Sequence, residues 1–276
     1  MANGFKTPQK VAACLVDETC VKKVKLSLLS MTLLGFLAGV YIAFGGELMT
    51  IVTSDLVPYL GMGFSKFLGG SVFATGLILV VVAGAELFTG NTQMMAGWLG
   101  RSISGKELLR NWGVVYFSNF LGSLFIVCLI YLSGQWKLGD YTVGATALNI
   151  AIDKVNLGWI EAFARGILCN WLVCLAVWMA SAAQDIIGKI FAIYFPIMAF
   201  VASGFEHSIA NMYLIPIGLF LKNEASVIEA AGVVNLSNLT WAGFLWNNLI
   251  PVTLGNILGG ALFVGGIYYF AYLPRR

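Results

Sequence analysis

The residues best suited to chemistry are Glu206 and His207, two ionisable side chains in the middle of a long apolar stretch. The stretch covers residues 187–221 and exceeds the ~20 residues that one membrane crossing requires. Ionisable groups at that depth are costly and mark substrate or proton paths. Ser203 and Gly204 precede the pair and loosen a helix, so we expect an interrupted helix whose break faces a pore. His207 is the single histidine of the chain and can donate a hydrogen bond or carry a proton.

A similar polar interruption occurs in the first half of the chain. Residues 84–91, with the sequence Gly-Ala-Glu-Leu-Phe-Thr-Gly-Asn, divide the apolar stretch 62–98. The next span of each half carries a matching motif, Asn-Phe-Leu-Gly-Ser at 119–123 and Asn-Ile-Leu-Gly-Gly at 256–260. Because each half has an odd number of crossings, the second half must be inverted relative to the first. Inverted repeats with paired broken helices place a site near the bilayer midplane.

The composition is that of a membrane protein. Hydrophobic residues form 59% and charged residues 11% of the 276 residues, and the mean hydropathy is +0.86. We therefore predict an all-α polytopic membrane protein of one transmembrane domain, with an N-terminal helix over 1–25, a first three-span repeat over 26–134 and an inverted repeat over 158–273. Its six transmembrane helices, of which the second and fifth are broken, are expected at 26–53, 62–98, 108–134, 158–183, 187–221 and 241–273.

The basic residues indicate the orientation. Eleven of the 16 fall on one side of the predicted spans, namely Lys6, Lys10, Lys22, Lys23, Lys25, Arg101, Lys106, Arg110, Lys189, Arg275 and Arg276. By the positive-inside rule both termini are cytoplasmic, in a multi-pass protein of the inner membrane. Thr7 and Pro8 predict the start of an amphipathic helix that extends to about Lys25. Two roles are open for this helix, lying in the membrane interface or gating the pore mouth.

Several other function classes lack their signatures. The five cysteines form no CxxC pair and no Cys/His cluster, so we expect neither a metal site nor a cofactor. No HExxH motif occurs, and on a helix the adjacent side chains of Glu206 and His207 point about 100° apart, a poor acid–base geometry. An enzyme is therefore not expected. The net charge of +3 arises in loops between spans and does not indicate nucleic-acid binding.

Four segments together resemble the formate/nitrite transporter family over nearly the whole chain. They are residues 86–90, 166–176, 202–211 and 251–256, and the Gly-Phe-Glu-His-Ser run that begins at Gly204 is highly specific. The resemblance implies an aquaporin-like protomer and a homopentamer with one pore per protomer. It also implies passage of small monovalent anions of weak acids: formate, nitrite and hydrosulfide define the branches, and some members handle acetate and lactate. Motifs similar to both the formate and the nitrite branch occur, and we favour formate.

The resemblance also implies roles for individual residues. Thr89 and His207 would face each other at the pore centre. Two apolar constrictions would be formed by Phe73, Leu77, Leu87, Val173 and Phe200. The broken helices would be supported by Asn170, Asn211 and Asn256, and Lys154, in a predicted loop over 151–157, would attract the anion at the outer mouth.

Glu86 and Glu206 lie at the two interruptions, and two roles are open for them. Each carboxylate can accept backbone N–H groups freed by the break, which we favour, or transfer protons directly. We hypothesise that a weak-acid anion is protonated in the vestibule, by His207 or by a proton arriving through water, and crosses as the neutral acid. The open alternatives are a proton-coupled secondary transporter of the same anions and a nitrite- or hydrosulfide-selective channel. Arg165 stands four residues after Glu161, which predicts a helical ion pair.

Overall fold

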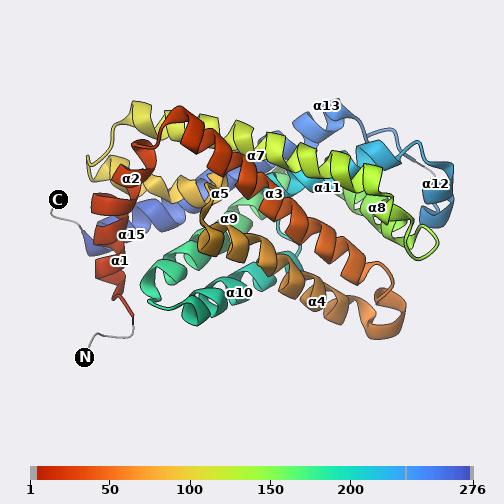
Figure 1. Cartoon of the computed structure of the whole chain (residues 1–276), viewed down its shortest axis with the longest axis horizontal. Helices are drawn as coiled ribbons and strands as arrows, with labels where there is room; N and C mark the ends of the chain where they lie inside the picture. Colours follow the sequence, from red (N-terminus) through yellow and green to blue (C-terminus); the bar gives the residue numbers. More distant parts are fainter. Residues whose placement is uncertain (1–4, 234, 274–276) are drawn as a thin grey trace.

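The structure, a computed structural model, describes residues 5–233 and 235–273. Within these ranges every named element is a helix (Figure 1). The elements are α1 Pro8–Cys14, η1 Leu15–Thr19, α2 Cys20–Val24, α3 Leu28–Thr53, α4 Val57–Leu79, η2 Val80–Gly84, α5 Phe88–Asn91, η3 Thr92–Met94, α6 Met95–Leu99, α7 Gly105–Ser133, η4 Gln135–Lys137, α8 Thr142–Val155, α9 Trp159–Ala182, α10 Ile186–Ala202, α11 Ser208–Leu221, α12 Ala225–Ala231, α13 Trp241–Gly243, η5 Phe244–Leu249, α14 Ile250–Gly260, η6 Ala261–Gly266 and α15 Ile267–Tyr272. Arg275 and Arg276, two of the basic residues that indicate the orientation, lie outside the described residues.

Five helices in the described part are long and apolar enough to cross a membrane: α3, α4 with η2, α7, α9 and the run from α13 to α15. Two shorter apolar helices, α10 and α11, lie between the fourth and fifth of these. The protein is therefore a multi-pass membrane protein. α4 is bounded at Val57, where Pro58 occupies the first turn, but its backbone leaves the helical conformation at Gly61, with φ 73° and ψ 164°. The uninterrupted helix therefore follows from about residue 62, where the second span was expected to begin.

The N-terminal helix packs on the rest of the protein. Thr7 accepts a hydrogen bond from the Lys10 backbone N–H and Pro8 opens α1, which confirms the predicted start. The apolar side of this helix is buried, with Val16 1% and Cys20 0% exposed. It therefore lies against protein at one end of the molecule, beside α15 (Figure 1).

The opposite end of the molecule is formed by α8 and α12 (Figure 1). The sequence predicted a loop around Lys154, but the structure places this residue in the last turn of α8. The helix forms because Val143, Ala147, Leu148 and Ala151 recur at helical spacing and are all buried.

Both halves of the protein contain a close helix pair packed through glycine. In the first half α3 packs on α7, and a Cβ added to Gly39 would lie 2.0 Å from the Asn119 carbonyl oxygen. In the second half α9 packs on α14, and a Cβ added to Gly255 would lie 2.2 Å from the Phe163 carbonyl oxygen. Small residues allow membrane helices to approach to backbone contact. The α3–α7 pair and the α9–α14 pair therefore correspond to each other in the two halves.

Between the two helices of each pair, the chain leaves the helical conformation at a glycine. η2 ends at Gly84, which has a φ of 84°, and α5 begins at Phe88. α10 ends at Ala202, and α11 begins at Ser208 after Gly204, which has a φ of 71°. Glycine adopts positive φ without a Cβ clash, so both positions suit a residue without a side chain.

Candidate pore site

Two asparagines hold the non-helical segments. Asn119 of α7 accepts a hydrogen bond from Phe88 N–H at 3.0 Å and donates to the carbonyls of Gly35 at 2.6 Å and Glu86 at 2.9 Å. The first bond satisfies an N–H group that has no partner inside its own helix. Asn119 is fully buried, so these three bonds are shielded from water.

Asn256 of α14 makes the corresponding bonds in the second half. It accepts from Ser208 N–H at 2.8 Å and donates to the carbonyls of Gly166 at 2.8 Å and Glu206 at 2.9 Å. The supporting position predicted for Asn256 therefore has a structural counterpart in Asn119. The repeated Asn-containing motif was the signal for both.

Each glutamate at an interruption is bonded to side chains rather than to the backbone N–H groups that were favoured from the sequence. Glu86 accepts from Lys23 at 2.6 Å and from Asn91 at 2.8 Å. Both glutamates are buried, Glu86 7% and Glu206 4% exposed, so each needs a neutralising partner. The first N–H of each new helix, at Phe88 and Ser208, is instead bonded to an asparagine.

Glu206 has the equivalent partners. It accepts from Lys154 at 2.7 Å, from Asn211 at 2.7 Å and from Asn248 at 3.2 Å. Asn248 also donates to the backbone carbonyl of Lys154 at 3.0 Å, which fixes the chain that carries the lysine. Lys154 is thus half of a buried ion pair.

Thr89 and His207 lie together between the two halves. Thr89 Oγ1 and His207 Nε2 are 2.9 Å apart, and both residues are buried. The other ring nitrogen, Nδ1, accepts a hydrogen bond from the Ala210 backbone N–H at 3.0 Å. An imidazole nitrogen that accepts carries no proton, so in the neutral ring the proton lies on Nε2, which donates to Thr89.

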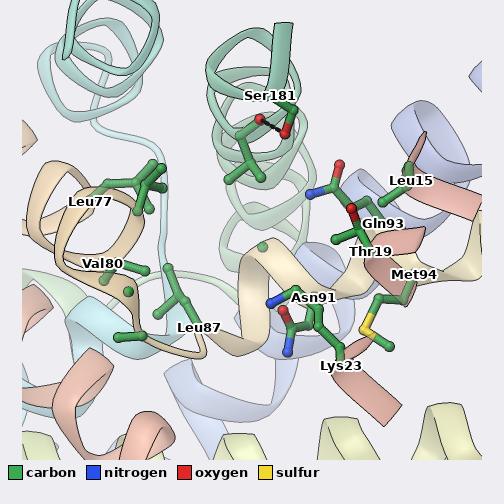
Figure 2. Close-up of a pocket in the computed structure, with 15 residues that line it drawn as sticks. Leu15, Thr19, Lys23, Leu77, Val80, Leu87, Asn91, Gln93, Met94 and Ser181 are labelled. Atoms are coloured by element: carbon green, nitrogen blue, oxygen red, sulfur yellow. Dashed lines mark hydrogen bonds between the residues drawn. The ribbon is translucent and has the colours of Figure 1, made fainter. Parts of the chain in front are cut away.

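Two cavities lie near this pair, one lined by the neighbours of Thr89 and the other by His207. The Lys23 cavity, of about 200 Å³, is lined by Lys23, Leu77, Leu87 and other residues, including part of the N-terminal helix. Figure 2 shows Leu77, Val80 and Leu87 on one side of it and Lys23 on the other. The Lys154 cavity, of about 120 Å³, contains Lys154 and His207 among its lining residues.

The expected constriction residues divide between the two cavities. Leu77 and Leu87 line the Lys23 cavity, whereas Phe73 and Phe200 line the Lys154 cavity. The rings of Phe73 and Phe200 meet edge to face with centroids 5.8 Å apart, and Phe200 stacks on His207 at 5.8 Å. Val173 is 1% exposed and belongs to neither set of lining residues.

Asn170 connects the Thr89 segment to the second half. Its Nδ2 lies within hydrogen-bond distance of the Thr89 carbonyl at 3.1 Å, Thr92 Oγ1 at 2.9 Å and the Asn256 carbonyl at 2.6 Å. Asn170 therefore acts on backbone position and lines neither the Lys23 cavity nor the Lys154 cavity.

Arg165 forms the predicted ion pair with Glu161, one helical turn away, and also donates to the Gly204 carbonyl at 3.4 Å. It thereby contacts the second interruption from outside the cavity.

Sequence reasoning missed Lys23, Asn91, Asn111 and Asn248. A usable signal was present: an Asn follows the glutamate by five residues in both interruptions, at Asn91 and at Asn211. Asn91 and Asn211 each donate to a further asparagine, Asn111 at 2.9 Å and Asn248 at 2.6 Å. Lys23 had no comparable signal, because its partner is brought close only by folding of the N-terminal helix.

Comparison with known proteins agrees with this architecture. The family model described as "Formate/nitrite transporter" matches residues 10–270. A "Probable formate transporter" of Methanothermobacter thermautotrophicus is 45% identical and covers 100% of both chains, and the formate channel FocA of Escherichia coli strain K12 is 40% identical over 96% of this chain and 94% of its own. A solved structure described as "Pentameric formate channel with formate bound" superposes with a TM-score of 0.80 at 40% identity, covering 89% of this chain and 98% of that one. The chain belongs to the formate/nitrite transporter family.

Proposed function

We propose that this protein is a channel for small monovalent anions of weak acids, with formate as the principal substrate and nitrite as a second. One observation carries the proposal: the buried Thr89–His207 hydrogen bond joins a segment that lines one cavity, through Leu87 and Gly90, to His207, which lines the other. The names of the relatives, which are formate transporters and channels, support the choice of formate.

Loss of charge is the central requirement for passage. Moving a bare carboxylate-sized ion into a medium like dry protein costs on the order of 20 kcal/mol. Phe73 and Phe200 beside His207 offer no hydrogen bond that would offset this cost. The neutral acid avoids most of it. The anion is therefore protonated in a cavity and crosses the apolar constriction as the acid.

His207 acts in this scheme as a hydrogen-bond donor. Protonating its Nδ1 would break the bond from Ala210 N–H that caps α11. Of the two proton sources considered from the sequence, water in the cavity is favoured over the imidazole. Thr89 Oγ1 accepts from Nε2, so its own hydroxyl proton is available to an oxygen of the permeating molecule.

The two lysines bring anions to the cavities. Each lysine offers the anion a positive group at a cavity wall and neutralises a buried glutamate that would otherwise repel the anion. The helices that begin at Phe88 and Ser208 add their N-terminal partial charge, worth roughly 0.3–2 kcal/mol each.

The site residues act in a single transmembrane domain of six crossings. α4 continues through the interruption into the helices over 88–99 as a broken second span, and α10 with α11 forms a broken fifth span. The grouping of α1 and α15 at one end supports an even number of crossings (Figure 1). We propose a cytoplasmic location for both termini and the inner membrane as the location of the protein, from the distribution of basic residues. The superposition on a pentameric formate channel supports a homopentamer.

The proposal is tested by uptake into liposomes of formate, nitrite, hydrosulfide, acetate and chloride at two pH values. Formate and nitrite uptake is expected to rise as the pH falls, with little chloride uptake. His207→Phe and Thr89→Val each remove one buried hydrogen-bonding partner. Each is expected to lower the rate of formate uptake at least tenfold. Selective chloride uptake without weak-acid uptake would contradict the proposal. Unitary conductance steps in a planar bilayer distinguish a channel from a proton-coupled carrier.

A further inference from the structure

A third cavity lies at the end of the protein that carries α8 and α12, far from the N-terminal helix. It has a volume of about 410 Å³ and lies between the end of α7, the following turn and the start of α12. Its residues are absent from the linings of both pore cavities. Nothing in the transport mechanism uses it.

One wall of this cavity is an ordered aromatic cluster. Tyr131 stacks on Trp136 with ring centroids 5.9 Å apart, and Tyr141 contacts the same indole at 5.9 Å. The Trp136 ring N–H donates to the Tyr131 carbonyl at 3.0 Å. Tyrosine and tryptophan near the end of a membrane span lie at the depth of the lipid headgroups.

The turn that delivers Tyr141 is strained. Gly139, Asp140 and Tyr141 are successive residues with φ of 61°, 50° and 69°. A non-glycine residue in this region costs about 1–2 kcal/mol. Such strain persists where the surrounding structure enforces it, and it gathers at binding sites.

The cavity carries one positive and one negative side chain. Lys137 stands over the Trp136 ring with Nζ 5.1 Å from the centroid. Glu224 accepts a hydrogen bond from Tyr131 through Oε1 at 2.5 Å, and no hydrogen bond to its Oε2 occurs among the described residues. Neither charge is in an ion pair within the ranges 5–233 and 235–273.

An apolar stripe on α7 leads from the membrane to this cavity. Phe117, Leu121, Phe125 and Leu132 recur along one side of the helix and are 69%, 56%, 47% and 78% exposed. Leu132 also lines the cavity, so the stripe and the charged pocket are continuous. A ligand that fits both has a dipolar polar end and an apolar tail.

We propose that this cavity binds a zwitterionic phospholipid with a primary ammonium in its headgroup. The phosphate lies against Lys137 and the ammonium donates to Glu224, while the acyl chains lie along the α7 stripe. We favour a primary ammonium because it can donate a hydrogen bond to Glu224 Oε2, whereas a quaternary ammonium has no N–H to donate.

The test is native mass spectrometry of the full-length protein after exposure to phosphatidylethanolamine, phosphatidylcholine or phosphatidylglycerol. We expect phosphatidylethanolamine to be retained most strongly, and Lys137→Gln and Glu224→Gln each to weaken its retention about tenfold. The matched controls are Lys66→Gln and Glu229→Gln, which change exposed charges outside the cavity and leave retention unchanged.

Three results would overturn the proposal. The first is equal retention of all three lipids in the wild-type protein and both cavity variants, which would indicate nonspecific annular lipid. The second is displacement of the lipid by soluble glycerophosphoethanolamine at equal concentration, which would show that the stripe contributes nothing. The third is burial of the stripe between copies of the chain, seen as an oligomer that Leu132→Glu dissociates without any headgroup preference.

Discussion

Asn119 and Asn256 make the same three hydrogen bonds in the two halves of the protein. Each accepts from the first N–H of a new helix and donates to the carbonyl of a glutamate and of a glycine on the neighbouring long helix. These bonds satisfy backbone groups of the non-helical segments next to Thr89 and His207. Inside a membrane no water is available to these groups, so without the asparagines they would stay unpaired.

Replacing either asparagine with leucine is therefore expected to destabilise the protein strongly. In Asn119→Leu the Phe88 N–H and the Glu86 carbonyl lose a buried hydrogen bond, at about 1–3 kcal/mol each, whereas the Gly35 carbonyl keeps its bond within α3. The thermal midpoint in detergent measures the effect. Asn149→Leu is the control, because Asn149 is exposed on α8 and should shift stability by less than about 0.5 kcal/mol. Equal midpoints in the two variants would refute the supporting role.

The Lys154–Glu206 pair predicts a double-mutant rescue. Lys154→Gln leaves the Glu206 carboxylate buried without a cation, which is strongly unfavourable and repels anions. Formate uptake should fall further in this variant than in Lys154→Gln combined with Glu206→Gln, where no charge remains. The comparison is made in liposomes at low and high salt. If the fold-loss of formate uptake in the double variant equals the product of the fold-losses in the two single variants, Lys154 and Glu206 do not act as a pair.

The close approach of α3 and α7 predicts different effects for two glycine substitutions. Gly39→Ala places a methyl group 2.0 Å from a backbone oxygen of α7, so the helices must separate. We expect a loss of more than about 2 kcal/mol, by analogy with overpacked cores. Gly113→Ala on α7 meets no atom within 4 Å and should be neutral or stabilising by up to about 1 kcal/mol. Chemical denaturation in mixed micelles compares them, and an unaffected Gly39→Ala would disprove the contact.

Cys20 reports whether the N-terminal helix is docked. Burial raises the pKa of its thiol to about 12, so at pH 8 it is almost wholly in the unreactive thiol form. In variants that retain one cysteine, a maleimide should label the half-buried Cys14 much faster than Cys20. The Cys20 rate should rise as the pH is raised towards its pKa. Lys23→Gln removes the ion pair with Glu86 and should accelerate Cys20 labelling. If Cys20 is labelled as fast as Cys14 while Lys23 is retained, the helix is not docked.

The membrane class, the repeat and the central residues could all be predicted from the amino-acid sequence. Long apolar runs can be stable only in a bilayer, and polar interruptions such as Glu86 and Glu206 are too costly there to be incidental. The family resemblance added Thr89 and His207 as a pair. These features depend on residue type and on spacing along the chain, which are visible before folding.

The lysines that neutralise the two buried glutamates became known only from the folded chain. Lys23 and Glu86 are 63 residues apart, and Lys154 and Glu206 are 52 apart, so no local spacing rule could join them. The protonated nitrogen of His207 likewise follows from a bond to Ala210 N–H that exists only once α11 begins at Ser208. Long-range pairing inside a low-dielectric interior is a property of the packed helices, because only their packing brings the partners together and excludes water.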